Sequence, residues 1–307
     1  LENHVDTLSI SGVYEPKLIA TYSNGYKSNI SDSATITTSD LTVFKSNKSY
    51  YGAKSGKVIF DIKFKEYTFK DTVTVSEIEY VDISKFPFLN TPSNPNANIV
   101  IPVVVVNYYP TLNGIDVDTK RSPGLGTASP ITLDGIKEKT VQFLNLTKYG
   151  LEQGSKFRGY NNPSQVSSVS FKVVKYINVY EIKRGLPGVQ KEITDRDPIR
   201  FKQDILTPVY QPEYIELFTK INLKQLVENE GVKEVWFSLR PISNEYPVVK
   251  NENISPENFI NLPESNMSSP TGDVSNSVRY QNDLPVYNKT YVVYGYNLET
   301  SSANMIH

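Results

Sequence analysis

A repeated alternation of apolar and polar residues constrains the fold of this chain more than any other feature. Between residues 56 and 76, Val58, Phe60, Ile62 and Phe64 alternate largely with Lys and Asp, and a Thr-Val-Thr-Val segment repeats the pattern. Side chains of a β-strand point alternately to two faces, so this period predicts strands with one buried and one hydrated face. The chain is therefore expected to build a β-sheet that covers a core.

Turn signals extend the β prediction over residues 5–80. The strongest is Asn24-Gly25, which stands between strand-like residues and is typical of a tight hairpin. Several short strands at this spacing favour a β-sandwich. The 21 Tyr residues agree with this interpretation, because a Tyr on a strand can bury its ring while its hydroxyl reaches water.

The order of motifs in this region is similar to that of a known module. L-x-A-T-Y-S-N-G is followed by A-T-I-T-T-S-D, a Gly-containing turn, a Lys-Val-Ile-Phe strand and a closing T-V-T-V. This order resembles the group 2 bacterial immunoglobulin-like domain, with Ile36 where that family usually has Trp. The resemblance implies an immunoglobulin-like β-sandwich over residues 1–84, used as an extracellular spacer or adhesion module.

A larger second domain is predicted after a linker. Residues 85–98 are rich in Pro and Asn, which neither a helix nor a central strand accommodates easily. Beyond them IVIPVVVVNYY reads as a buried strand, residues 132–152 as an amphipathic helix capped by Thr132, and residues 222–231 as a short helix leading into VKEVWFSL. A helix that enters a strand is typical of α/β or α+β folds, and we expect an α+β domain over residues 99–307.

Composition excludes several classes of function. The formal net charge is −1, which removes the electrostatic footprint of a nucleic-acid binder. There is no Cys, and the two His are His4 and His307, so thiol nucleophiles, a three-His zinc centre and an internal Ser-His-Asp triad are excluded. No apolar run reaches 18 residues, so membrane insertion is not expected. Any catalysis would depend on carboxylates, Tyr, Lys, Arg or a metal held by oxygen.

Several separated motifs of the second region carry another resemblance. They are I-P-V-V-V-V-N-Y-Y-P-T-x-N-G, L-E-Q-G-S-K-F-R-G-Y, V-K-E-V-W, P-E-S-N-M and Y-G-Y-N-L-E-T-S-S-A-N-M-I-H. Together they resemble an uncharacterised family of secreted bacterial proteins. The resemblance implies export to the cell surface or the medium.

The stretch PESNMSSPTGDVSNS, residues 263–277, is the first candidate site. Its oxygen-bearing residues include Glu264, Asn266, Asp273 and Asn276. Oxygen ligands of this kind suit calcium, with Asp273, Asn276 and Glu264 as the metal candidates, or the hydroxyls of a sugar. The alternative is a solvated loop whose Ser and Asn side chains bond their own backbone. Nothing in the sequence requires a cofactor, and the one candidate is calcium.

An organised site in this stretch would have a definite packing. Met267 would be a buried anchor and Glu264 would point inward, where a carboxylate needs a cation or several N–H donors. Arg158 is the expected partner, and it could instead bind an anionic group of a ligand. The plainer alternative pairs Arg158 with Glu152 or with the end of the preceding helix.

Three acids are candidates for catalysis. Hydrolysis of a glycosidic bond needs two carboxyl groups across a cleft, and Glu264 with Glu152 or Glu234 could supply them. Glu234 and Trp236 are two residues apart on a predicted strand, so they share a face and could combine an acid with a stacking platform for a ligand. A Trp on a strand is more often part of the core.

The leading hypothesis is a secreted or cell-surface bacterial protein that binds an extracellular glycan or protein, or assembles with itself. The alternative is a secreted hydrolase of polysaccharide or peptide that uses acidic residues of the second domain. A catalytic pair facing one cleft would favour the enzyme. The lack of internal His and Cys favours binding or structure.

Overall fold

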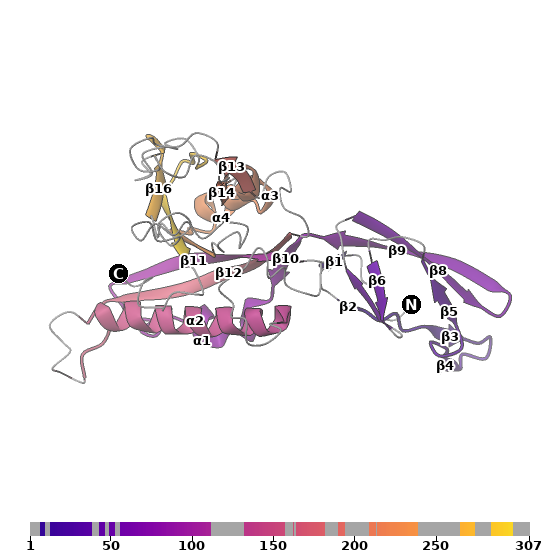
Figure 1. Ribbon diagram of the computed structural model, residues 1–307. Helices are drawn as coiled ribbons and strands as arrows, with labels where there is room; N and C mark the ends of the chain where they lie inside the picture. The colour runs from indigo at the N-terminus through magenta and orange to yellow at the C-terminus, as the bar shows by residue number, and fades with distance from the viewer. Residues whose placement is uncertain are drawn as a thin grey trace, which may run out of the picture. The chain divides into compact units, whose positions relative to one another are not determined.

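The computed structural model describes most of the chain in separate stretches (Figure 1). The described residues are 7–9, 13–38, 43–46, 49–52, 56–111, 132–156, 162, 164–181, 190–193, 209–212, 214–238, 265–273 and 284–296. They form two compact units: the described residues up to Glu79, together with Thr111, belong to the first, and the others to the second. Strand β10 (Ile78–Val81) crosses this boundary and is described with the second unit, whose sheet it joins. The fold is rich in β-structure and contains several antiparallel sheets, as predicted.

The first unit consists of strands. They are β1 (Thr7–Ser9), β2 (Val13–Tyr14), β3 (Ile19–Thr21), β4 (Lys27–Asn29), β5 (Thr35–Thr37), β6 (Val43–Ser46), β7 (Ser49–Gly52), β8 (Gly56–Phe64) and β9 (Tyr67–Ser76). Within the described residues they form one sheet in the order β1-β9-β8-β5, a second in the order β2-β7-β6, and the separate hairpin β3-β4. All pairs are antiparallel except β1 with β9, which run parallel.

The alternation in β8 places the core of this unit. Val58, Phe60 and Ile62 are fully buried, whereas the residues between them are exposed. The rings of Tyr14 from β2 and Tyr50 from β7 each lie 4.8 Å from the Phe60 ring, centroid to centroid. Phe60 therefore joins the two larger sheets of the unit through one aromatic cluster.

The second unit is built on one mixed sheet. Its elements are β10 (Ile78–Val81), the 3₁₀ helix η1 (Ile83–Lys85), α1 (Pro87–Asn90), β11 (Ile99–Pro110), α2 (Leu133–Gly154), β12 (Val169–Glu181), β13 (Gln190–Ile193), β14 (Val209–Pro212), α3 (Tyr214–Lys220), α4 (Leu223–Glu228), β15 (Glu234–Ser238), β16 (Ser265–Ser269), β17 (Gly272–Asp273) and β18 (Tyr291–Tyr296). The strand order is β10-β12-β11-β15-β18-β16-β17. In this unit α1 and α2 lie on one side of the sheet and α3 and α4 on the other (Figure 1).

The centre of this sheet corrects the expected α+β class. Strands β12, β11, β15 and β18 are neighbours and all run parallel, and helix α2 connects β11 to β12. Parallel neighbours need crossover connections, which usually contain helices, so this is α/β connectivity. Numbered by their order along the chain, the four neighbouring strands read 2-1-3-4. This is a doubly wound arrangement: the chain first adds β12 on one side of β11 and then continues on the other side with β15, so the order of the strands reverses between β11 and β15. Antiparallel pairs in the described part of this unit include β16 with both β17 and β18 at the edge of this sheet, and β13 with β14 in a separate two-stranded sheet.

The segment predicted as a linker, residues 85–98, lies within the second unit. Pro87 occupies the first turn of α1, where a missing N–H costs nothing. Leu89 of this helix is fully buried in the core that α2 shares with the sheet. Asn94 donates a backbone hydrogen bond to Ser170 Oγ and a side-chain bond to the Ser167 carbonyl. Pro and Asn therefore shape a packed turn here.

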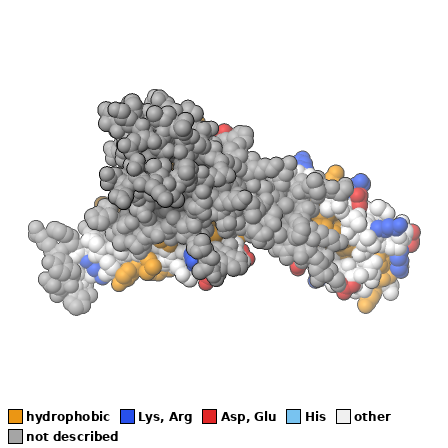
Figure 2. Space-filling model, viewed as in Figure 1, with side chains coloured by type: hydrophobic (Ala, Val, Ile, Leu, Met, Phe, Trp, Pro, Cys, Tyr) orange, Lys and Arg blue, Asp and Glu red, His pale blue; other side chains and the backbone are white. Residues whose placement is uncertain are grey.

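The predicted helices are present with nearly the expected bounds. Thr132 caps α2 by accepting a hydrogen bond from the Gly135 N–H at 3.1 Å. Helix α4 buries Leu223, Leu226 and Val227. Among the described residues, no helix is both long enough and apolar enough to cross a membrane. The exposed surface mixes hydrophobic and charged side chains (Figure 2).

Candidate functional site

Part of the first candidate site lies outside the described residues. This holds for Glu264, Arg158 and Asn276, and the side chains of Asn266 and Asp273 are not described either. The expected contact between Glu264 and Arg158 therefore stays a prediction, as does calcium binding. Within the described stretches, no group of three or more His, Asp or Glu residues is placed to hold a metal.

The described part of that stretch is a β-hairpin, and the packing predicted for Met267 is wrong. Met267 is 38% exposed, whereas its neighbour Ser268 is fully buried. Both lie on β16, where successive side chains point to opposite faces of the sheet. Ser268 therefore faces the covered side, and Met267 faces the more exposed side. The sequence favours a site or a loop here, whereas the described residues form the last two strands of the sheet, β16 and the edge strand β17.

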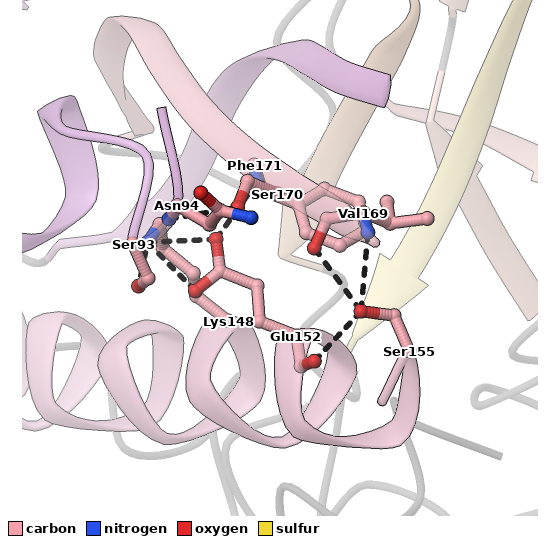
Figure 3. A network of polar contacts seen from close by, with 8 residues as sticks. All are labelled: Ser93, Asn94, Lys148, Glu152, Ser155, Val169, Ser170 and Phe171. Carbon is pink, nitrogen blue, oxygen red and sulfur yellow. Dashed lines mark hydrogen bonds and ion pairs between the residues drawn. The ribbon is translucent and has the colours of Figure 1, made fainter. Parts of the chain in front are cut away.

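Glu152 belongs to a buried ion pair (Figure 3). Its carboxylate lies 3.0 Å from the Lys148 Nζ, and the two side chains are 2% and 0% exposed. The same carboxylate accepts a hydrogen bond of 2.8 Å from the Phe171 N–H. Lys148 Nζ also donates to Ser93 Oγ and lies 4.7 Å from the centre of the Phe88 ring. These contacts occupy the carboxylate and make Glu152 a structural residue.

Ser155 extends this network past the end of α2. Its hydroxyl donates to the Glu152 carbonyl at 2.8 Å and accepts from the Val169 N–H at 3.2 Å. The end of the helix is thus tied to the beginning of β12, while Asn94 binds Ser170 on the same strand. The network fixes α2 and the segment after α1 against one strand.

Glu234 and Trp236 share a face, as predicted, and they contact each other directly. The Trp236 indole N–H donates a hydrogen bond of 2.9 Å to the Glu234 carboxylate. Trp236 is 1% exposed, and its ring packs 5.6 Å from that of Phe171 within the core. The ring is therefore packed as part of the core, which is the more common role of a Trp on a strand. Burial raises the pKa of Glu234, and the indole hydrogen bond partly opposes that effect.

Both acids lie at the amino ends of the parallel strands. Glu234 begins β15, and Glu152 binds the backbone near the beginning of β12. In open α/β sheets ligands bind beyond the carboxyl ends of the strands, where the strand order reverses. The topology thus predicts a ligand site at the carboxyl ends of β12, β11 and β15, at the opposite end of the sheet from these two acids.

A row of polar side chains crosses that end of the sheet. Asn107 of β11 is in register with Asn178 of β12 on one side and with Ser238 of β15 on the other. The Asn107 amide donates to the Asn178 side-chain oxygen at 3.2 Å, and Ser238 Oγ accepts from the Tyr108 N–H at 2.8 Å. All three row residues are buried, whereas the in-register row below them is Tyr176, Val105 and Trp236. We call Asn178, Asn107 and Ser238 the polar row.

Aromatic residues stand directly beyond the polar row. The rings of Tyr109 and Tyr180 are in register and 6.0 Å apart. The Tyr109 hydroxyl donates to Thr140 of α2 at 3.2 Å, and Lys137 of the same helix lies 5.0 Å from the centre of the Tyr180 ring. Asn178 also donates to the Tyr180 hydroxyl, at 3.5 Å. Helix α2 therefore sets both the position and the polarity of this layer.

The side chains of the polar row and the hydroxyls of Tyr109 and Tyr180 are uncharged groups that form hydrogen bonds. An Asn amide both donates and accepts, as do Ser and Tyr hydroxyls, so the polar row and tyrosine layer suit ligands rich in hydroxyl or amide groups. The sequence held a signal for the site that our prediction did not use. The apolar run VVVV ends in Asn107, and an Asn likewise interrupts the pattern near the end of β12.

Comparison with known proteins adds nothing to this geometry. No model of a known protein family matches the chain, and a search of curated proteins gives no match either.

Proposed function

We propose that this chain is part of an exported bacterial protein that binds an extracellular ligand through its second unit. The polar row is the observation that carries the proposal. Burying polar side chains costs free energy unless they are hydrogen-bonded, and a core needs none of them. Three such residues in register at the switch point of a doubly wound sheet coincide with the usual place of a ligand site.

The proposed ligand is a neutral glycan. Asn107, Asn178 and Ser238 carry no charge and offer both donors and acceptors, which match sugar hydroxyls. A protein is a less suitable ligand for a site of three uncharged polar side chains. The near-neutral net charge agrees with recognition that does not depend on long-range attraction.

The first unit is proposed to be an immunoglobulin-like β-sandwich that acts as a spacer or adhesion module. Two features support this: the motif order of residues 1–84, and the contact of Tyr14 and Tyr50 from one sheet with Phe60 from the other. The same motif order supports an extracellular location.

The experiment compares two serine variants of the full chain. Ser238→Ala removes the acceptor of a backbone N–H at the polar row, and Ser170→Ala removes the same kind of acceptor at the amino end of the sheet. The probes are neutral cello-, xylo- and manno-oligosaccharides. Binding is measured as a rise in melting temperature followed by Trp236 fluorescence, because a ligand that binds only the folded state stabilises it.

We expect at least one oligosaccharide to raise the melting temperature of the wild type and of Ser170→Ala, and to have no effect on Ser238→Ala. Ser238→Ala should lose about 1–3 kcal/mol of stability for the unpaired buried Tyr108 N–H, and Ser170→Ala should lose less because the Asn94 N–H is only partly buried. Absence of any ligand-induced rise in the melting temperature of the wild type, or an equally reduced rise in Ser170→Ala and Ser238→Ala, would contradict the proposal.

A hydrolase that uses Glu234 is the second candidate, and one observation favours it. The raised pKa of this carboxyl is the property that a general acid requires. If Glu234 donates a proton, Glu234→Gln should abolish release of reducing sugar from the same oligosaccharides without abolishing binding. Equal release by Glu234→Gln and the wild type would exclude this role.

A further inference from the structure

A pair of exposed tyrosines stands on the β3–β4 hairpin of the first unit. Tyr22 is 44% exposed and Tyr26 is 63% exposed. Their ring centroids are 5.9 Å apart, and the ring planes are inclined by 35°. Hydrophobic side chains reach the surface of this unit among charged ones (Figure 2). Two adjacent aromatic rings at the surface of a small hairpin contribute little to its core.

The hairpin holds the two rings in place. The Tyr22 N–H donates to the Tyr26 carbonyl at 2.8 Å, and the Gly25 N–H donates to the Tyr22 carbonyl at the same distance. Gly25 has φ +81°, a conformation that favours Gly, and Asn24 Oδ1 accepts from the Tyr26 N–H at 3.0 Å. The turn is therefore fixed by its own backbone, and little conformational freedom is left to lose on binding.

The base of the hairpin is anchored in the unit. The Ile30 N–H donates to the Leu18 carbonyl at 2.9 Å, and both side chains are buried. Ser31 Oγ accepts from the Leu18 N–H at 2.8 Å. A rigid base with an exposed aromatic tip is an arrangement suited to binding, because rigid Tyr side chains supply contact area at low entropic cost.

We infer that Tyr22 and Tyr26 form a second binding site, for the neutral sugar rings of a polysaccharide. The C–H faces of a sugar ring can pack against the aromatic rings, and its hydroxyls can bond Ser23 and Asn24 at the turn. Lys27 is the one charged residue between Tyr22 and Asn29, so the hairpin offers little for recognition of an ionic group. This site is separate from the polar row and does not depend on it.

The test is affinity electrophoresis of the full chain in native gels that contain hydroxyethylcellulose, xylan, mannan or laminarin. The variants are Tyr22→Ala, Tyr26→Ala and Tyr67→Ala. Tyr67 is the matched control, because it is 64% exposed and lies in the same unit on a different hairpin. Circular dichroism and the melting profile of each variant verify that the first unit is folded. Ser238→Ala is included to separate this site from the polar row.

We expect at least one polysaccharide to retard the wild type and Tyr67→Ala, also in high salt. Tyr22→Ala and Tyr26→Ala should each weaken retardation at least about tenfold, equal to about 1.4 kcal/mol. Retardation that only Ser238→Ala abolishes would overturn this inference and leave the proposed function intact. An unretarded wild type in all four gels, or equal losses in Tyr67→Ala and Tyr26→Ala, would also overturn it.

Discussion

The buried ion pair of α2 permits a quantitative prediction. Lys148→Met removes the cation and leaves the Glu152 carboxylate with its hydrogen bond from the Phe171 N–H (Figure 3). Removing one member of a buried pair costs about 3–5 kcal/mol, because the other charge stays buried without compensation. A typical domain is stable by about 5–15 kcal/mol, so this single change should consume a large part of the stability of the second unit.

The double variant tests whether the cost comes from the unpaired charge. In Lys148→Met with Glu152→Gln, no charge is buried, and the Gln carbonyl can still accept from the Phe171 N–H. We expect this variant to lie within about 2 kcal/mol of the wild type, since replacing a buried pair by neutral residues is often nearly neutral. Each single variant should therefore be less stable than the double variant.

The assay is urea unfolding followed by tryptophan fluorescence. Trp236 is the only Trp in the chain, and its buried ring packs against Phe171, so its emission reports on this unit. The control is Lys220→Met in α3, because Lys220 and Glu216 form an i,i+4 pair at 3.5 Å with side chains 33% and 48% exposed. That variant should change stability by about 0.5 kcal/mol or less. Losses below about 1 kcal/mol in Lys148→Met, or a double variant as unstable as the sum of the singles, would refute the reasoning.

Three further predictions concern single side chains. Because the pKa of Glu234 is raised, the folded state keeps the carboxyl proton to higher pH than the unfolded chain does. Its contribution to stability is therefore fully present below the ordinary pKa of 4.5 and is lost as the pH rises through the pKa of the folded state. Glu234→Gln should thus gain stability relative to the wild type as the pH rises above that ordinary value, in urea titrations followed by Trp236 fluorescence, and a difference that is constant with pH would contradict this. Tyr14→Phe removes the hydroxyl that donates to buried Asp71, and calorimetry should show the first unit destabilised by about 1–3 kcal/mol with the Trp236 transition unchanged. Met267→Ala should cost less than about 1 kcal/mol, because the side chain is 38% exposed, and a loss in the range of core truncations would show that it packs elsewhere.

Local periodicity predicted the elements of this fold well. The buried residues Val58, Phe60 and Ile62 on one face of β8, and the Thr132 cap of α2, follow from spacing within a few residues. Such patterns depend on the geometry of one strand or helix, which neighbouring residues determine. They do not say which strands pair, so they do not predict the parallel order β12-β11-β15-β18, and the class expected from the sequence is α+β.

The candidate site shows the same limit. Asn107, Asn178 and Ser238 are separated by 71 and 60 residues in the chain, and only the register of three strands brings them together. The carboxylates attracted attention in the sequence because acids carry most hydrolytic chemistry. Glu152, however, has a cation four residues before it on the same helix, and that spacing favours a pair.

The parallel pairing of β1 with β9 has a mechanical consequence. Thr7 pairs with Thr74 and Ser9 with Ser76, so the first strand and the last strand of the first unit run side by side in the same direction. A force that pulls the chain by its two ends would slide these strands past each other and load their hydrogen bonds in shear, all at once. In an antiparallel pair at that position, the same force would open the bonds one after another. The first unit is thus arranged to resist stretching along the chain, as its proposed role as an extracellular spacer would require.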